Sequence, residues 1–307
     1  MRFDSRPAAD PRGIGRYARC LLDALHAEAA EHGGEMVEGR EPGRSDDLFH
    51  SPWLNGALLR PKVPMVVTLH ELVALKRTGQ FLRAGLRARM RFLALERAAR
   101  LIVPSRVVAA DAEELLHLDP GRIHVIPEAP AAAFSPRSEA EVAAARRRYR
   151  LPDAYLLWVG DLRHPEPSKR VASLTHAPRE LPLVLVGDTG QWARQLEGVT
   201  LTGSVPVDDL AAIYTGAHAL VFPSEDEGFG LPVIEALACG TPVVACDLPA
   251  LREVVGEHAT FVEPGDFAGL MSAAQSAERP APEPPRWSWQ DAAGATWEVY
   301  ERASLTS

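Results

Sequence analysis

The sequence predicts an α/β protein of two domains, each built around a parallel β-sheet. Apolar runs of strand length alternate with segments of helical period, which is the pattern of βαβ units. Several of these runs are continuously apolar, as expected for strands that are covered on both faces. The 307 residues are enough for two domains of about 150 residues, each with its own core.

The second half of the chain has the more regular pattern. Strands are expected at residues 155–160, 183–187, 199–201, 219–222, 242–246 and 260–262. Helices are expected near residues 170–175, 191–196, 208–215, 232–238 and 267–274. This alternation predicts one parallel sheet with crossover helices.

The first half is less regular. An amphipathic helix is expected over residues 14–29 and a long helix over residues 80–99. Strands are expected at residues 48–50, 65–69, 101–104 and 124–126. The polar stretch 31–45 leaves room for one short strand at most, so we expect a reduced N-terminal sheet.

A proline- and alanine-rich stretch divides the chain near its middle. Residues 127–136 belong to this stretch, and the arginine run 146–148 follows it. Together they indicate an interdomain connection, because such compositions are typical of linkers. The two domains are therefore expected at residues 1–135 and 151–285.

A final helix follows the proline-rich segment 280–285. It carries four large aromatic residues, Trp287, Trp289, Trp297 and Tyr300. So many aromatic side chains on one terminal helix indicate docking against a core. We expect this helix, at residues 286–305, to dock back on the N-terminal domain.

Composition and charge exclude several classes of protein. The formal net charge of −8 argues against a nucleic-acid partner, because nucleic-acid-binding domains usually have a basic balance. Cys20, Cys239 and Cys246 are odd in number and lack metal-ligand spacing, which favours a reducing compartment. No apolar signal segment precedes Arg2, and no apolar run has membrane-spanning length, so a cytoplasmic protein is expected.

The most informative segment is SEDEGFGLPVIE, residues 224–235, directly after an expected strand. Gly228 and Gly230 permit close backbone approach and positive φ, and Pro232 suits the first residue of a helix. Free N–H groups and the positive dipole end of such a helix suit a diphosphate. A strand, glycine loop and helix alone are nevertheless a weak signal.

Two glutamates bracket this loop. Glu227 can face a reacting sugar, and Glu235, placed in the first helical turn, can accept hydrogen bonds from ribose hydroxyls. Each has a plainer interpretation. A glutamate in a first turn stabilises the helix dipole without any ligand, and Glu227 can be a solvated loop acid beside Glu225 and Asp226.

The run from Glu227 to Glu235, with the ALACGTPVV that follows, resembles the E-x7-E signature of family 4 retaining glycosyltransferases. Five further segments resemble the family in the expected order: GIGRY (13–17), FHSP (49–52), TLHEL (68–72), IVPS (102–105) and RIHVIP (122–127). The ending WSWQ (287–290) resembles the family's terminal helix. The resemblance covers nearly the whole chain. It implies the GT-B fold, two Rossmann-like domains facing a cleft, with the terminal helix crossing back to the N-domain.

The resemblance implies roles for the matching residues. As catalytic residues it implies Glu227 beside the transferred sugar, His70 against a sugar hydroxyl, and Lys169 against the departing diphosphate. The remaining donor-binding residues are expected to be Glu235, Gly228, Phe229, Gly230, Leu231, Arg163, Gly13 and Gly15. Outside the motif, His70 is typical of a buried structural histidine. Ser105 is a weaker candidate for a cleft hydroxyl, with a helix N-cap as the alternative.

The basic loop at residues 160–170 departs from the family pattern. Lys169 falls about three residues late, Asp161 occupies a position that is often Arg, and Arg163 is a possible partner for Lys169. A solvated helix start is the alternative interpretation. The prolines of this loop should keep residues 163–167 out of helix.

Two single residues also depart from the family. Glu71 stands where Asp is usual. Glu128 and Ala129 replace a common Asn-Gly at the end of the N-domain, which lowers the backbone freedom there.

The resemblance implies a retaining hexosyltransferase of glycan biosynthesis. It would move a sugar from a UDP- or GDP-linked donor to a glycan, lipid-linked or small-molecule acceptor. The motifs contain no obvious covalent nucleophile, which favours front-face attack. No Asp-x-Asp metal site is visible, so neither a metal nor another cofactor is expected, and Lys169 and the helix end would neutralise charge.

Two alternatives stay open. One is a catalytically degenerate nucleotide-sugar-binding subunit that supports a partner, and the other is epimerisation or hydrolysis on a related fold.

The expected helix over residues 80–99 carries a basic stripe of Arg83, Arg87 and Arg91. A docked helix with a solvated basic face explains it. The alternative is peripheral contact with the inner face of an anionic membrane that carries a lipid-linked acceptor.

Overall fold

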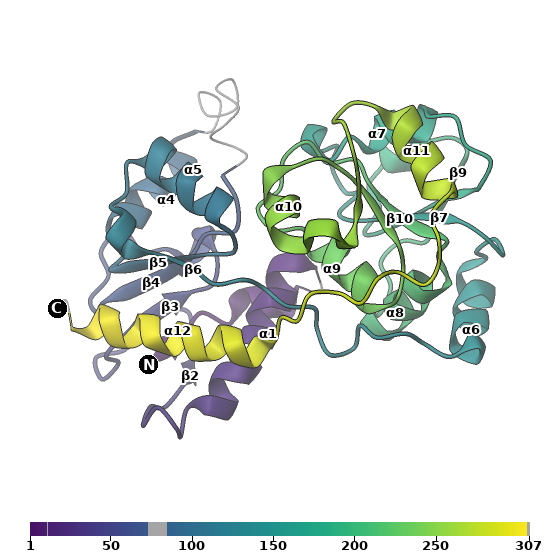
Figure 1. Cartoon of the computed structure of the whole chain (residues 1–307). Helices are drawn as coiled ribbons and strands as arrows, with labels where there is room; N and C mark the ends of the chain where they lie inside the picture. The colour runs from purple at the N-terminus through teal and green to yellow at the C-terminus, as the bar shows by residue number, and fades with distance from the viewer. Residues whose placement is uncertain (11, 73–84, 306–307) are drawn as a thin grey trace. The chain divides into compact units, whose positions relative to one another are not determined.

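The computed structural model describes residues 1–10, 12–72 and 85–305, with side chains for all of these except 85–89. The chain divides into two compact units (Figure 1). Unit 1 comprises Met1–Ala129 and Trp287–Ser307, and unit 2 comprises Pro130–Arg286. Each unit has its own parallel sheet and its own hydrophobic core.

The sheet of unit 1 has the strand order β2-β1-β3-β4-β5-β6, with every pairing parallel. Its strands are β1 (Arg2–Phe3), β2 (Val37–Glu38), β3 (Phe49–Ser51), β4 (Met65–Thr68), β5 (Arg100–Val103) and β6 (Ile123–Val125). One short strand, β2, lies between the first helix and β3, as expected. In the residues that the structure describes, the sheet nevertheless has as many strands as that of unit 2, so its reduction is in strand length: β1 and β2 have two residues each.

Helices cover both faces of this sheet (Figure 1). They are α1 (Gly13–Glu28), α4 (Gly85–Glu96), α5 (Arg106–Leu116) and α12 (Trp289–Ser304), with short 3₁₀ turns η1 (Arg6–Ala9), η2 (Leu54–Gly56) and η3 (Pro120–Arg122). Successive strand residues point to opposite faces. Val66 accordingly packs in the core with α1 and α12, whereas Met65 and Val67 pack in the core with α4 and α5.

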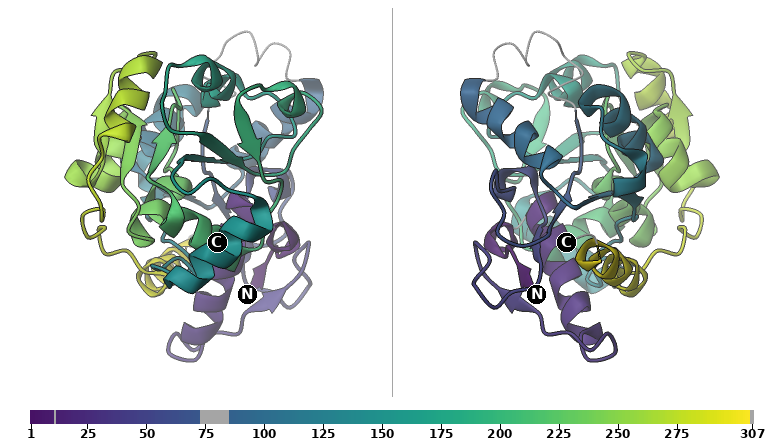
Figure 2. Two further views of the ribbon diagram at one scale, coloured as in Figure 1. Left: turned by 90° about the vertical axis from the view of Figure 1, so that its right-hand side faces the viewer. Right: turned by 90° about the vertical axis from the view of Figure 1, so that its left-hand side faces the viewer.

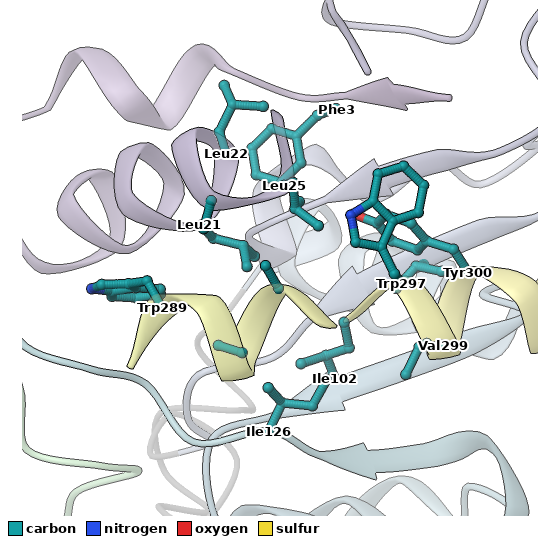
Figure 3. Close-up of a cluster of buried hydrophobic side chains, with 14 of the residues drawn as sticks. Phe3, Leu21, Leu22, Leu25, Ile102, Ile126, Trp289, Trp297, Val299 and Tyr300 are labelled. Atoms are coloured by element: carbon teal, nitrogen blue, oxygen red, sulfur yellow. The ribbon is translucent and has the colours of Figure 1, made fainter. Parts of the chain in front are cut away.

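The terminal helix α12 is part of the core of unit 1. It lies beside α1 (Figures 1 and 2) and also contacts β4 and β5. Figure 3 shows its Trp297 and Tyr300 among Leu21 and Leu25 of α1 and Ile102 of β5. Burying a whole aromatic side chain removes roughly 200 Å² of surface from water. The hydrophobic free energy gained is about 5 kcal/mol, before the loss of conformational entropy is subtracted. This burial explains Trp289, Trp297 and Tyr300 on the terminal helix, whereas Trp287, expected on the same helix, precedes its first residue.

The sheet of unit 2 has the order β12-β11-β10-β7-β8-β9, again with every pairing parallel. Its strands are β7 (Leu156–Val159), β8 (Leu183–Val186), β9 (Val199–Leu201), β10 (Ala219–Phe222), β11 (Val243–Cys246) and β12 (Thr260–Val262). All six expected strands are confirmed. The order reverses between β7 and β10, and such a switch point is where open α/β sheets bind ligands, at the carboxyl ends of the strands.

The helices of unit 2 depart from the prediction at three places. The helices are α6 (Glu139–Tyr149), α7 (Val171–His176), α8 (Val207–Gly216), α9 (Leu231–Ala238), α10 (Pro249–Val255) and α11 (Phe267–Gln275), with η4 (Pro167–Lys169), η5 (Ala193–Gln195) and η6 (Gly256–His258). Helices α6 and α10 were not expected. The arginine run 146–148 is not part of a connection but the last turn of α6, where cations complement the helix dipole. Within residues 191–196, expected to be a helix, only the 3₁₀ turn η5 forms.

Candidate functional site

The loops that follow β7 and β10 are bound to each other at the switch point of unit 2. The Lys169 ammonium, at the end of η4, donates to Glu227 Oε1 across 2.7 Å. The backbone N–H of Glu225 donates to the carbonyl oxygen of Ser168 at 2.8 Å. The structure therefore brings together two of the three residues expected to be catalytic.

The Lys169–Glu227 pair is largely withdrawn from solvent on the carboxylate side. The Glu227 side chain is 7% exposed and that of Lys169 is 31% exposed. Glu227 is thus not the solvated loop acid of the alternative interpretation. A carboxylate removed from water needs a partner cation or several hydrogen-bond donors, and Lys169 supplies the cation.

The unusual length of the basic loop is absorbed before Lys169. The expectation that residues 163–167 stay out of helix holds for residues 163–166 and is wrong for Pro167, which is the first residue of the 3₁₀ turn η4. Glu166 fixes this turn by accepting from Ser168 Oγ at 3.0 Å. The next helix, α7, begins at Val171, so Lys169 precedes a helix rather than standing in one.

Arg163 contacts two carboxylates of unit 2, those of Asp161 and Asp188. Its Nη2 donates to Asp161 Oδ2 at 2.8 Å, and its Nε lies 3.8 Å from Asp188 Oδ2. These carboxylates follow β7 and β8, respectively. Asp161, which departs from the family pattern, thus compensates the charge of Arg163.

The glycine loop leads into α9. Gly230 has φ of +92°, and a Cβ there would lie 2.6 Å from Leu251 Cδ2, so glycine is required. The helix begins at Leu231, one residue before the expected start at Pro232. Phe229 is buried, which anchors the turn that leads into α9.

Glu235 is fully buried in the second turn of α9. Because the helix starts at Leu231, the expectation that Glu235 lies in the first turn is wrong, and the dipole-capping interpretation loses its basis. The Tyr214 hydroxyl, from α8, donates to Glu235 Oε2 at 3.2 Å. This carboxylate is therefore held in a defined orientation.

In unit 1, His70 follows β4 and contacts acceptors through both ring nitrogens. Nδ1 lies 2.8 Å from Glu128 Oε1, and Nε2 lies 3.0 Å from the Pro52 carbonyl oxygen. Burial by itself lowers the pKa of His70. The hydrogen bond and charge of Glu128, the Pro52 carbonyl and the charge of Glu71 outweigh burial, so the pKa is raised above its ordinary value.

A buried chain of hydrogen bonds next to His70 has no counterpart in the sequence analysis. Tyr300 OH lies 2.6 Å from His50 Nδ1, His50 Nε2 lies 2.9 Å from Thr68 Oγ1, and Tyr17 OH lies 3.0 Å from the same Thr68 oxygen. The chain joins α12, β3, β4 and α1. Burial, with a smaller contribution from the charge of His70, lowers the pKa of His50 to about 3. Tyr17, His50 and Thr68 lie in three of the segments that resemble the family, but nothing in the sequence indicated that they contact one another.

Three other candidates have local structural roles. Gly13 is the first residue of α1. A Cβ on Gly15 would collide with the backbone carbonyl oxygen of Asp10, so this glycine permits close packing of α1 on the preceding turn. Ser105 caps α5 by accepting from the Val108 N–H at 3.3 Å, which confirms the N-cap interpretation.

The basic stripe of the first half is described only in part. Arg83 lies outside the described residues, and so does the side chain of Arg87, whereas Arg91 is exposed on α4.

Among the residues with described positions, no helix is long and apolar enough to cross a membrane. Within the same residues, no group of three or more His, Cys, Asp or Glu side chains is arranged to hold a metal ion.

Comparisons with known proteins agree with this architecture. The family described as glycosyl transferases group 1 matches residues 150–277, and glycosyltransferase family 4 matches residues 47–129. D-inositol 3-phosphate glycosyltransferase 2 of Catenulispora acidiphila is 31% identical over 310 residues, which cover 86% of this chain and 72% of that protein. O-antigen chain mannosyltransferase B of Escherichia coli is 34% identical over 159 residues, 45% of this chain and 41% of that protein.

A solved structure shows the fold. The crystal structure of HepE from Anabaena, in complex with UDP and glucose, superposes with a TM-score of 0.68 at 16% identity. The superposition covers 99% of this chain and 95% of HepE. The two parallel-sheet units thus have the GT-B architecture.

Proposed function

We propose, since the chain belongs to the family 4 glycosyltransferases, that this enzyme is a retaining transferase that uses a nucleotide diphosphate sugar. The acceptor is a hydroxyl of a glycan, a lipid-linked sugar or a small molecule. UDP and GDP are the candidate nucleotides. The complex of HepE with UDP and glucose, and the mannosyltransferase and D-inositol 3-phosphate glycosyltransferase among the relatives, support this class of substrate.

The observation that carries the proposal is the ion pair of Lys169 with Glu227, 2.7 Å apart at the switch point of unit 2. A departing diphosphate gains negative charge in the transition state, and a preorganised ammonium stabilises it without reorganisation of solvent. The reacting sugar gains positive charge, which a nearby carboxylate stabilises. Lys169 and Glu227 therefore offer one group for each developing charge.

Glu235 is proposed to hold the ribose of the donor. Its carboxylate is buried and oriented by the Tyr214 hydroxyl, and two adjacent ribose hydroxyls can donate to one carboxylate. The start of α9, four residues earlier in the chain, would meet the diphosphate through the backbone of Gly228, Phe229, Gly230 and Leu231.

The proposed chemistry is front-face substitution. The bond between the anomeric carbon and the phosphate oxygen breaks, and the acceptor oxygen forms a bond to that carbon on the same face. The acceptor proton passes to the departing phosphate oxygen. Lys169 and the positive end of the α9 dipole stabilise the charge of that phosphate, so the proposal requires no metal ion.

Nucleotide release from a panel of UDP-, GDP-, ADP- and TDP-sugars tests the proposal. We expect release from a UDP or GDP sugar, stabilisation against heat by the matching nucleotide, and a product whose anomeric configuration equals that of the donor in NMR spectra. An inverted product would refute retention. Binding of a nucleotide without turnover of any donor would instead favour the degenerate subunit.

Peripheral membrane contact through the basic stripe is a separate proposal. The exposed Arg91 on α4 supports it, and co-sedimentation with vesicles at low salt tests it. Equal binding to anionic and neutral vesicles would refute an electrostatic attachment.

A further inference from the structure

Both ring nitrogens of His70 face hydrogen-bond acceptors. The Pro52 carbonyl oxygen, 3.0 Å from Nε2, can only accept. A neutral imidazole has one N–H, and Nε2 needs that proton for Pro52. The 2.8 Å contact of Nδ1 with the Glu128 carboxylate therefore requires a second proton. The imidazolium satisfies both contacts at once.

The surroundings of His70 favour the cation. Glu128, which follows β6, is 3% exposed and His70 is 15% exposed, so each compensates the other's buried charge. The neighbouring carboxylate of Glu71 also raises the pKa of His70. From α1, the ring of Tyr17 packs edge-on at a centroid distance of 4.6 Å. From β3, His50 is held neutral by burial, because its pKa is lowered to about 3.

The two bonds of His70 differ in strength. The Nδ1 contact joins opposite charges and is the stronger one, whereas the Nε2 contact ends on a neutral carbonyl. A ligand oxygen can therefore replace Pro52 more easily than Glu128. With Glu128 in place, any oxygen that reaches His70 must act as an acceptor.

We propose that Glu128 is a positioning residue, which holds His70 as an imidazolium donating through both nitrogens and so makes it a donor-only contact for an oxygen of the transferred sugar. The part of this inference that concerns the sugar rests on the proposed function. The protonation state does not.

The first test is ¹⁵N NMR of the histidine rings in the full chain, with His70 assigned by its loss in His70→Gln. We expect both ring nitrogens of His70 to be protonated at neutral pH. In Glu128→Gln, which keeps an acceptor oxygen without the charge, the titration of His70 should move down by about one pH unit or more. Glu128→Asp should restore part of this difference. Glu71→Gln is the matched control for charge and should cause a smaller displacement, because the charge of Glu71 raises the pKa of His70 less than Glu128 and the Pro52 carbonyl do.

The second test is the pH profile of transfer. The alkaline limb of kcat/KM should move to lower pH in Glu128→Gln and return towards the wild-type position in Glu128→Asp. A merely structural role of Glu128 would lower activity equally at every pH. A single protonated nitrogen in wild-type His70 at neutral pH refutes the inference, even if Glu128→Gln does not fold.

The two proposals can fail separately. A His70 imidazolium that depends on Glu128, in a chain that releases nucleotide from no donor, refutes the proposed function and keeps the protonation state. A neutral His70 in an active enzyme refutes this inference alone.

Discussion

Removing the Lys169 ammonium is the most direct perturbation of the proposed site. Lys169→Met keeps most of the apolar stem and deletes the charge, so the Glu227 carboxylate loses its cation. Lys169→Arg keeps a cation but replaces the compact ammonium with a planar fork, and we expect partial activity.

The geometry gives the size of the effect. Unit charges separated by 2.7 Å, as Nζ and Oε1 are, attract by about 6 kcal/mol at an effective dielectric constant of about 20. The lost hydration of Glu227 and the ordering of the lysine side chain offset most of this gain. Because Lys169 is partly exposed, we expect Lys169→Met to destabilise the fold by about 1–3 kcal/mol, and the pair to show a coupling energy in the same range.

The effect on catalysis should be larger than the effect on binding. Charge on the departing diphosphate grows in the transition state, so the lost ammonium costs more there than in the ground state. We expect kcat to fall roughly a hundredfold and nucleotide affinity about tenfold. Glu227→Gln should reduce transfer by a similar factor and leave nucleotide affinity nearly unchanged.

Catalysis is measured as nucleotide release under saturating donor. The coupling energy is measured by denaturant unfolding of Lys169→Met, of Glu227→Gln and of the variant that carries both changes. Arg163→Ala is the matched control, because Arg163 lies in the same loop but pairs with Asp161 on the surface. Such an exposed pair contributes about 0.2–1 kcal/mol, and this variant should be mild. Loss of transfer in Arg163→Ala with a silent Lys169→Met would assign the basic role to Arg163. Silence of both variants would favour the degenerate subunit.

Four further outcomes follow from the described contacts. Glu235→Ala should weaken nucleotide binding by about 1.5–3 kcal/mol in calorimetry, and Tyr214→Phe should weaken it less, because it removes only the orienting hydroxyl; equal affinity in all three proteins would remove Glu235 from ribose binding. Gly230→Ala should lower the free energy of unfolding by about 1–3 kcal/mol, because a side chain at φ of +92° would be strained and would meet Leu251. His50 has a lowered pKa of about 3 in the folded chain. Its contribution to stability is therefore complete above the unfolded pKa near 6.5 and declines as pH falls to about 3, by up to about 1.4 kcal/mol per pH unit. His50→Gln should remove this slope from the free energy of unfolding measured between pH 6.5 and 4. Activity should survive EDTA, and complete inhibition reversed by Mg²⁺ would show that a metal ion supplies the charge stabilisation.

The sequence predicted unit 2 better than unit 1 for a physical reason. Strands buried on both faces appear as continuous apolar runs, and β7, β8 and β10 are fully or nearly fully buried along their length. In unit 1, β1 and β2 have two residues each, which is too short for any period to be visible. Helix α6 resembles a linker in sequence because only Ala145 is buried in it, so it has no apolar stripe.

The site was predicted as a set of residues but not as a set of contacts. The signature loop indicated a strand, a glycine turn and a helix, and these are present. The partners within each pair are 58 residues apart, both for Lys169 with Glu227 and for His70 with Glu128. The order of the strands brings Lys169 and Glu227 together, because β7 pairs with β10 although they are not consecutive. His70 and Glu128 follow β4 and β6, which both pair with β5. No local pattern encodes that adjacency.

The two units repeat one arrangement with different cations. In each, a nearly buried glutamate beyond the carboxyl end of one parallel strand holds a cation from the loop after another strand, lysine in unit 2 and histidine in unit 1. Histidine is the side chain whose ordinary titration falls near neutral pH. The raised pKa of His70 means that its charge, and the stability that its pair contributes, are complete below the unfolded value and are lost as pH rises through the folded one. The loss of function as pH rises through the folded pKa of His70 should therefore originate in unit 1, and Glu128→Gln should bring that loss to lower pH without changing the Lys169–Glu227 pair.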